Sequence, residues 1–243
     1  MSNVSIADLN EIKKQYQGKD LDIVLNKIEN GYPVQYVIGN VNFCGNKIIV
    51  NENVLIPRYE TEFLVELIKN TISSEFQGNI VDLGTGSGCI AITLGKIFKN
   101  SDIKGIDISC DAIDVANINK KNNEVTNVTF EAKDMLDIEN FDDFDIIVSN
   151  PPYVSYSEET GIETKYEPQN AIFADDDGLL FYKEIIKKVS LSMVKPKHIF
   201  FEIGMNQASK IKEYSKIYLD DYKVDVYQDL SKKDRYVHIY LNK

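Results

Sequence analysis

The tetrapeptide Asn150-Pro151-Pro152-Tyr153 combines groups that suit the recognition of a planar NH2 group. Asn150 offers a carboxamide oxygen, the prolines supply carbonyls without competing N–H donors, and Tyr153 adds a ring that can stack on a flat group. Such acceptors can hold an NH2 and leave its nitrogen facing a methyl donor. The same residues also occur in simple turns, so the tetrapeptide alone leaves both interpretations open.

A glycine-rich turn earlier in the chain is typical of nucleoside binding. Glycines let the backbone approach a ligand closely, although a lone G-x-G-x-G is weak evidence. Asp107 strengthens the nucleoside-binding interpretation. This residue ends the next predicted strand, where a carboxylate can accept hydrogen bonds from both hydroxyls of a ribose. A solvated strand-end carboxylate is the alternative for Asp107. The predicted cofactor site comprises Asp82, Gly84, Thr85, Gly86, Ser87, Gly88, Asp107, Asp134, Met135 and Asn150.

The charges in this predicted site favour one cofactor. A dinucleotide would set its pyrophosphate on the helix N-terminus, where Asp82 would bring negative charge close to it. S-adenosylmethionine has no phosphate and carries a sulfonium and an ammonium. An acidic pocket of Asp82, Asp107 and Asp134 therefore favours S-adenosyl-L-methionine, with S-adenosyl-L-homocysteine as product.

The elements that must position these residues alternate between strand and helix from residue 79 onward. The apolar run 144–149 leads directly into Asn150, and ligands of open α/β sheets bind beyond the carboxyl ends of the strands. The short polar loop between the last two strands requires an antiparallel pair. The pattern predicts a doubly wound, mostly parallel seven-stranded sheet with an antiparallel last strand. Its strands are predicted at 79–83, 103–107, 127–132, 144–149, 197–203, 222–228 and 236–241, and its helices at about 88–99, 110–122, 178–194 and 206–219.

Three parts are expected along the chain. Residues 1–30 have apolar residues at helical spacing and predict two short helices broken at Gly18; residues 31–60 form a linker with a β-hairpin turning at Gly45-Asn46. Residues 61–243 form the catalytic domain, beginning with an amphipathic helix over 61–72. The stretch 150–177 is predicted to be irregular and to act as a lid over the acceptor, because such long loops are usually functional or disordered.

Composition narrows the class of protein. The 243 residues carry a net charge of −11, which opposes binding of a phosphate backbone and makes a nucleic-acid partner unlikely. The three cysteines form no C-x-x-C pair, so neither a disulfide framework nor a metal site is expected. There is no apolar run of membrane-spanning length and no signal sequence, and a cytoplasmic protein without membrane association is expected.

The combination of these motifs resembles the class I S-adenosylmethionine-dependent methyltransferases and, more narrowly, the release-factor glutamine N5-methyltransferases, also called the PrmC or HemK family. The narrower resemblance covers about Gly31 to Tyr240. It rests on family segments that lie in order along the chain, at 33–39 with Phe43, 54–62, 150–153, 165–168, 177–179 and 201–204. Family members usually carry a longer helical N-terminal domain, whereas about 30 residues precede the linker here. Tyr59 replaces a common proline, and a lysine within 229–235 replaces a usual glycine.

The resemblance implies a specific reaction and substrate. Asn150 and the carbonyl of Pro151 would accept the two N–H bonds of a substrate amide, Pro152 would complete the substrate site, and Tyr153 would flank the amide. The substrate would be the glutamine of the Gly-Gly-Gln motif in class I peptide-chain release factors, methylated at N5 in translation termination. Arg58 would pair with Glu60, Glu62 or a carboxylate near the cofactor.

Two other functions stay open from the sequence. An exocyclic NH2 of a nucleic-acid base, adenine N6 or guanine N2, presents the same planar geometry, although the net charge and the segments around Arg58 and Tyr166 oppose it. A non-catalytic nucleoside-binding module could also carry the glycine turn, but the intact tetrapeptide disfavours it. His198 and His238 lie within predicted strands and are expected to be structural.

Overall fold

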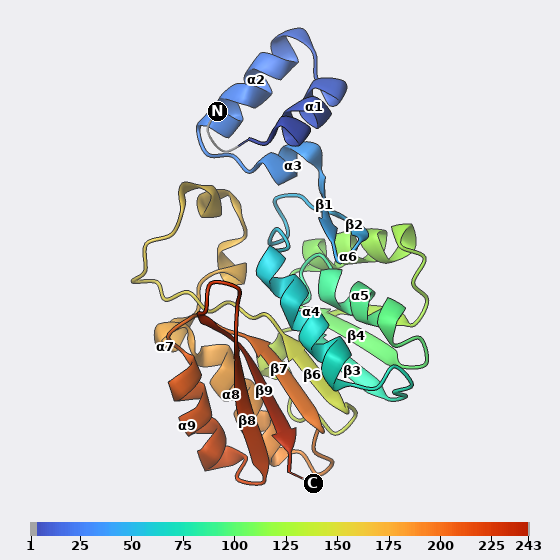
Figure 1. Cartoon of the computed structure of the whole chain (residues 1–243), viewed down its shortest axis with the longest axis vertical. Helices are drawn as coiled ribbons and strands as arrows, with labels where there is room; N and C mark the ends of the chain where they lie inside the picture. The colour runs from blue at the N-terminus through green and yellow to red at the C-terminus, as the bar shows by residue number, and fades with distance from the viewer. Residues whose placement is uncertain (1–3, 243) are drawn as a thin grey trace.

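The computed structural model describes residues 4–242 and contains a seven-stranded sheet in the order β5-β4-β3-β6-β7-β9-β8 (Figure 1). Strands β3 to β7 run parallel to one another, and β9 is antiparallel to both of its neighbours, β7 and β8. The predicted fold class is therefore confirmed. The antiparallel last strand, β9, lies between β7 and the edge strand β8. The strands are β3 (Asn79–Leu83), β4 (Asp102–Asp107), β5 (Val128–Ala132), β6 (Ile146–Ser149), β7 (His198–Glu202), β8 (Tyr222–Gln228) and β9 (Asp234–Leu241).

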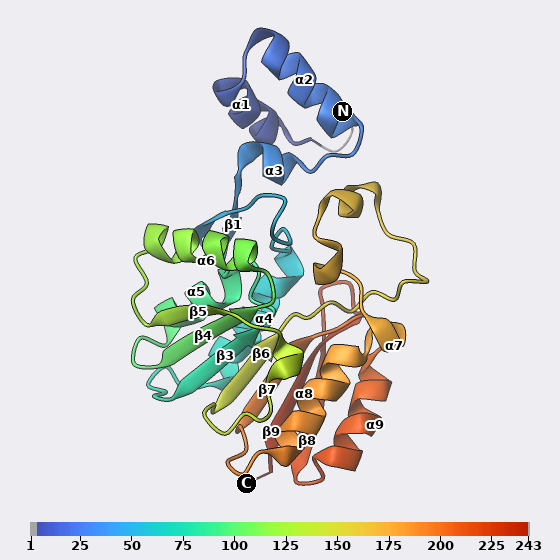
Figure 2. The same ribbon diagram turned by 180° about the vertical axis from the view of Figure 1, so that it is seen from behind.

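Helices cover both faces of this sheet (Figures 1 and 2). One face carries α4 (Tyr59–Thr71), α5 (Cys89–Ile97) and α6 (Cys110–Asn122), and the other carries α8 (Leu180–Leu191) and α9 (Ala208–Tyr218). Successive residues of a strand point to opposite faces. Accordingly, Ile146 and Val148 belong to the core under α4 and α5, whereas Ile147 belongs to the core under α8. Burial on both sides explains why β6 reads as a continuous apolar run.

The N-terminal part differs from the sequence expectation in two details. It contains α1 (Ile6–Gln15), α2 (Gly18–Glu29) and an additional short helix that was not predicted, α3 (Val34–Ile38), followed by the hairpin β1 (Asn40–Phe43) and β2 (Asn46–Ile49). The hairpin turns at Cys44-Gly45, one residue earlier than predicted, because Phe43 pairs with Asn46. Both turn residues have positive φ, 49° and 78°. Such values favour a tight two-residue hairpin turn.

The fully buried side chain of Asn119 in α6 fixes this hairpin to the sheet domain. Its Oδ1 accepts from the Ile49 N–H at 2.7 Å, and its Nδ2 donates to the Ile49 carbonyl at 2.9 Å. The same Nδ2 donates to the Ser87 carbonyl, within the glycine-rich turn, at 2.9 Å. One side chain thus couples the linker to the predicted cofactor site.

Residues 150–177 are more regular than expected. They contain η2 (Ile162–Tyr166), η3 (Gln169–Ala171) and the start of α7 (Asp175–Gly178), and Val154 exchanges backbone hydrogen bonds with Ile172 and Ala174 at 3.0 and 2.9 Å. The segment reaches towards the N-terminal helices (Figures 1 and 2). There Tyr166 packs edge-on against Tyr32 at 5.2 Å, and its hydroxyl donates to the Asn30 carbonyl at 3.3 Å. Within residues 4–242, no helix is long and apolar enough to cross a membrane.

Candidate active site

A cavity of about 180 Å3 lies where four parallel strands end. Gly84 and Gly86 follow β3, Asp107 ends β4, Met135 begins the short helix η1 (Met135–Asp137) after β5, and Asn150 follows β6. Six of the predicted cofactor residues line this cavity: Gly84, Gly86, Asp107, Asp134, Met135 and Asn150. The remaining wall comes from segments that the sequence did not assign to the site, including Asn53, Val54, Leu55, Ile108, Ser109, Pro168, Asn170, Ala171 and Phe181.

The Asp107 carboxylate lines this cavity and is held in place by hydrogen bonds from backbone N–H groups. Its Oδ2 accepts from the Gly86 N–H at 2.8 Å, and its Oδ1 accepts from the Ser109 N–H at 3.0 Å. Burial raises the pKa of Asp107, while these two N–H donors oppose the shift. Since a carboxylate has about four acceptor positions in all, Asp107 keeps acceptor capacity beyond these backbone bonds on the cavity side.

The other four predicted cofactor residues, Asp82, Thr85, Ser87 and Gly88, do not line the cavity. Asp82 is fully buried beneath the turn, where its Oδ2 accepts from the Thr85 hydroxyl at 2.6 Å and from the Ala91 N–H at 3.2 Å. Burial raises the pKa of Asp82 to about 7. The structure thus does not place Asp82 in an acidic pocket with Asp107 and Asp134; Asp82 supports the turn from behind.

Gly84 shows why the turn requires glycine. Its φ is +72°, a conformation that residues with a side chain rarely adopt, and a Cβ atom there would lie 3.2 Å from the Met135 methyl group. The absence of a side chain lets Met135 close the floor of the cavity. Met135 itself is 9% exposed, so it contributes a mostly buried apolar surface to the cavity.

A second cavity of about 180 Å3 adjoins the first and is lined by three residues of the tetrapeptide. Asn150, Pro151 and Tyr153 line it, together with the buried Glu202 at the end of β7; Pro152 faces the first cavity. Asn150 lines both cavities. The roof of the second cavity comes from the 150–177 segment through Val154, Thr160, Thr164, Ala171 and Ile172.

Gln207 holds the backbone of the tetrapeptide, a role that no sequence motif indicated. Its Nε2 donates to the Tyr153 carbonyl at 2.9 Å, and its Oε1 accepts from the Gly204 N–H at 2.9 Å. Gly178 approaches the same carbonyl so closely that a Cβ there would lie 2.0 Å from the Tyr153 oxygen. The end of α7 therefore packs directly on the tetrapeptide, and only glycine fits at position 178.

The local environment of Tyr153 and Arg58 is also defined. Burial, followed by the charge of Glu202, raises the pKa of Tyr153 to about 12, which keeps the phenol neutral near pH 7. Arg58 pairs with the buried Glu167, whose second oxygen accepts from the Ile56 N–H at 3.0 Å. Of the partners expected for Arg58, the structure shows neither Glu60 nor Glu62 but a third carboxylate, Glu167, which directly precedes the cavity-lining Pro168.

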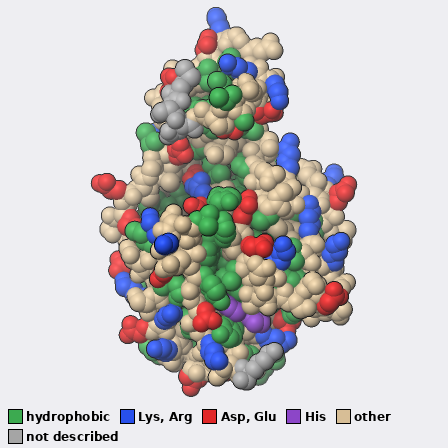
Figure 3. All heavy atoms as spheres, viewed as in Figure 1, with side chains coloured by type: hydrophobic (Ala, Val, Ile, Leu, Met, Phe, Trp, Pro, Cys, Tyr) green, Lys and Arg blue, Asp and Glu red, His purple; other side chains and the backbone are tan. Residues whose placement is uncertain are grey.

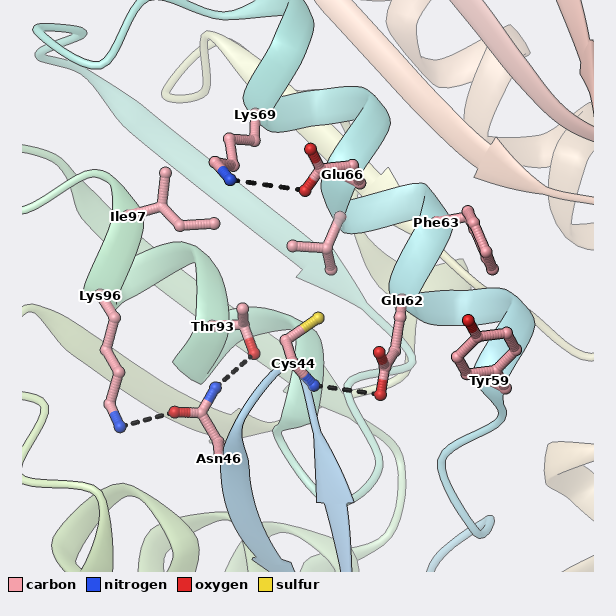
Figure 4. Close-up of a pocket in the computed structure, with 11 residues that line it drawn as sticks. Cys44, Asn46, Tyr59, Glu62, Phe63, Glu66, Lys69, Thr93, Lys96 and Ile97 are labelled. Atoms are coloured by element: carbon pink, nitrogen blue, oxygen red, sulfur yellow. Dashed lines mark hydrogen bonds and ion pairs between the residues drawn. The ribbon is translucent and has the colours of Figure 1, made fainter.

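A larger hollow of about 460 Å3 lies between α4, α5 and the hairpin (Figure 4). Several of its polar side chains are paired. Lys96 donates to Asn46, which donates to Thr93; Lys69 pairs with Glu66; and Glu62 accepts from the backbone N–H of Cys44. It shares no lining residue with the two cavities at the strand ends. We assign it to the packing of the hairpin against the domain.

The two histidines lie outside both cavities. His198 of β7 and His238 of β9 stack on each other with ring centroids 5.2 Å apart, and a hydrogen bond of 2.9 Å joins their ring nitrogens. His238 also stacks on Phe200 at 4.2 Å. This packing within the sheet agrees with the structural role expected for them.

Fold and site together define a methyltransferase of class I. The family model for the methyltransferase small domain matches residues 59–178. A methyltransferase from Pyrococcus furiosus aligns with a TM-score of 0.59 at 15% identity, over 93% of this chain and 98% of that one. The N-terminal domain of human METTL16 in complex with SAH aligns with a TM-score of 0.58 at 16% identity, over 82% and 77% of the two chains.

Sequence relatives give the narrower assignment. The release factor glutamine methyltransferase of Lactococcus lactis is 35% identical over 95% of this chain and 87% of its own length. That of Fusobacterium nucleatum is 40% identical over 87% of this chain, and the match spans 60% of its length. The chain belongs to the release factor glutamine methyltransferase family.

Proposed function

We propose that the protein transfers a methyl group from S-adenosyl-L-methionine to the side-chain amide nitrogen of the glutamine in the Gly-Gly-Gln motif of class I peptide-chain release factors. One observation carries this proposal: Asn150 lines both the cavity of the glycine-rich turn and the adjoining cavity of the tetrapeptide. A group passed from a ligand in the first cavity to one in the second would cross beside the Asn150 carboxamide. The names of the family relatives supply the identity of the substrate.

The first cavity suits the methyl donor. Asp107, with its remaining acceptor capacity, would hold the two ribose hydroxyls, and Met135 would pack on the adenine ring. Asp134 would accept from the adenine amino group, and Gly84 and Gly86 would let the backbone approach the ligand. The donor supplies an electrophilic methyl group on a sulfonium. SAH in the structurally similar human domain supports this cofactor class.

The second cavity suits a planar amide. An amide nitrogen is a poor nucleophile because its lone pair is delocalised into the carbonyl. The Asn150 Oδ1 and the Pro151 carbonyl would accept its two N–H bonds. Those bonds strengthen as positive charge develops on nitrogen during transfer, which is the differential stabilisation that accelerates the step. Tyr153, neutral and half-buried, would flank the amide and exclude water.

Each part of the chain would then have a separate role. We assign residues 61–243 to catalysis, 31–60 to the linker, and 1–30 to a helical segment beside the substrate face. The 150–177 segment supports this division, because it lines the second cavity and also contacts Asn30. A release factor would therefore be bound mainly by residues 150–177 and 33–62.

Mass spectrometry of a release factor incubated with the enzyme and cofactor tests the proposal. We expect one added methyl group on the glutamine of Gly-Gly-Gln and none when that glutamine is changed to glutamate, since a carboxylate offers no NH2. Duplex DNA is the comparison substrate. On the face shown in Figure 3, Lys and Arg side chains are interspersed with Asp and Glu, which argues against a track for phosphates. Methylation of DNA with the release factor untouched would refute the proposal.

A further inference from the structure

Two buried polar side chains, Thr61 and Glu202, stand behind Asn150, and the sequence assigned neither of them to the site. Thr61 in the first turn of α4 is 2% exposed, and Glu202 at the end of β7 is 1% exposed. The Thr61 hydroxyl donates to the Glu202 Oε2 at 2.8 Å, and the Asn150 Nδ2 donates to the Thr61 Oγ1 at 3.1 Å. The three side chains form a directed chain of hydrogen bonds, in which Asn150 donates to Thr61 and Thr61 donates to Glu202.

The direction of this chain follows from counting protons. A threonine hydroxyl has one proton, and a carboxylate can only accept. Because Thr61 gives its proton to Glu202, towards Asn150 it can act only as an acceptor. The NH2 end of the Asn150 carboxamide must therefore face Thr61, which leaves Oδ1 turned away from it. A reversed carboxamide would set two oxygens against each other without a proton between them.

We propose that Thr61 and Glu202 are positioning residues that fix the orientation of the Asn150 carboxamide, so that it presents an acceptor to the substrate amide. This inference rests on the proposed function, in which the Asn150 Oδ1 accepts a substrate N–H. The reversed Asn150 carboxamide would turn its NH2 towards the substrate NH2, so that two hydrogen-bond donors would face each other. These hydrogen bonds also connect two of the family segments, 54–62 and 201–204, since Thr61 lies in the first and Glu202 in the second.

The protonation of Glu202 adds a second consequence. Burial raises the pKa of Glu202 to about 7, against the opposing hydrogen bond from Thr61. A protonated Glu202 could itself donate to Thr61, which would free the Thr61 proton to point at Asn150 and reverse the chain. The directed chain therefore needs the ionised carboxylate. The ionisable or polar groups that act on Glu202 from the surrounding elements are Arg58, Glu60, Thr61, Tyr153, Tyr182, Arg235 and Tyr236.

Kinetics of a matched pair of variants test the positioning role. Thr61→Val keeps the shape of the side chain and removes the hydroxyl, whereas Thr61→Ser keeps the hydroxyl. We expect Thr61→Val to lower kcat for release-factor methylation by roughly tenfold or more, with KM and cofactor affinity changed less than about threefold. Thr61→Ser should restore most of the lost kcat. Equal kcat in the two variants would overturn the inference.

A pH profile gives a second measurement if Thr61→Val does not fold. In the wild type, kcat should fall as the pH drops below about 7, because the Glu202 carboxyl then takes up its proton. Glu202→Gln cannot titrate, so its kcat should lose this acid limb. An acid limb that persists unchanged in Glu202→Gln would contradict the inference.

A measurement without release factor separates this inference from the proposed function. The side-chain NH2 signals of Asn150 in the free enzyme can be assigned by NMR from their loss in Asn150→Asp. We expect one proton shifted downfield by its bond to Thr61, moved in Thr61→Val and retained in Thr61→Ser. Unchanged signals in Thr61→Val would overturn the positioning role. A wild-type enzyme that leaves the release factor unmethylated would refute only the proposed function.

Discussion

Arg58 and Glu167, 109 positions apart in the chain, form an ion pair that ties the segment before α4 to the 150–177 segment. The Glu167 side chain is 1% exposed, whereas that of Arg58 is 38% exposed. Glu167 directly precedes Pro168, which lines the cavity of the glycine-rich turn. The pair therefore fixes Glu167 next to Pro168, a lining residue of this cavity.

Removing Arg58 should destabilise the protein measurably. In Arg58→Ala the buried Glu167 carboxylate keeps only the Ile56 N–H as a partner, and the free energy of unfolding should fall by about 1–3 kcal/mol. Urea unfolding measures the change. Lys104→Ala, which breaks the exposed pair with Glu131, is the control and should cost at most about 1 kcal/mol. If both variants lost the same free energy of unfolding, the buried Glu167 carboxylate would not depend on Arg58 for its stability.

Binding of the cofactor should depend on Asp107. Asp107→Ala removes the proposed acceptors for the ribose hydroxyls and should weaken S-adenosyl-L-methionine binding by on the order of 1–3 kcal/mol in calorimetry. Asp102→Ala, at the exposed start of the same strand, should leave affinity unchanged. Unchanged affinity in a folded Asp107→Ala variant would remove the assignment.

Asn150 should act mainly in the transition state. Asn150→Ala should lower kcat by roughly 100-fold or more, because it removes a preorganised acceptor, while cofactor affinity changes less. Steady-state kinetics and calorimetry on the same preparation give both values. Asn70→Ala, at the exposed end of α4, serves as the control. Turnover near that of the wild type in Asn150→Ala would mean that the tetrapeptide is only a turn.

The stability of the protein should depend on pH through Asp82. Its folded pKa, about 7, lies above its ordinary value because the carboxyl is buried, so the folded state holds the proton more tightly than the unfolded state. This contribution is fully present at low pH and is lost as the pH rises through about 4 to 7, with a slope of at most about 1.4 kcal/mol per pH unit.

Asp82→Asn tests this dependence, since it cannot ionise. Urea unfolding of wild type and variant across that pH range should show a shallower fall in the variant. Asp102→Asn on the surface should follow the wild type. Parallel curves for wild type and Asp82→Asn would mean that Asp82 is ionised in the folded protein.

Deletion of residues 1–30 should affect substrate binding more than chemistry. The deletion removes the Asn30 carbonyl, which accepts from the Tyr166 hydroxyl and from the Lys165 ammonium of the 150–177 segment. We expect KM for the intact release factor to rise more than kcat falls, because binding common to the ground and transition states is lost. Tyr166→Phe, which removes one hydrogen bond, should change KM less. An unchanged KM in the folded deletion variant would limit these helices to packing.

The order of elements and the residues at the strand ends could be predicted from the sequence, because both follow from local patterns. Strands buried on both faces must be apolar, as at 144–149, and the carboxyl ends of parallel strands meet at one edge of the sheet. That rule alone brings Gly84, Asp107 and Asn150 together. The family segments around the tetrapeptide likewise pointed to the reaction before any geometry was known.

Contacts between side chains distant in sequence were decided only by the tertiary structure. The partner of Arg58 is Glu167 and not the nearby Glu60 or Glu62, since the fold of the lid determines which carboxylate reaches it. The sequence predicted Asp82 as a cofactor-site residue, but its side chain is buried beneath the glycine-rich turn, because alternate residues of β3 point to opposite faces of the sheet. The chain from Glu202 through Thr61 to Asn150 joins three elements whose packing no local pattern specifies. Periodicity is a property of neighbours along the chain, whereas the direction of a buried hydrogen bond depends on which groups the folded core brings within 3 Å or so of each other.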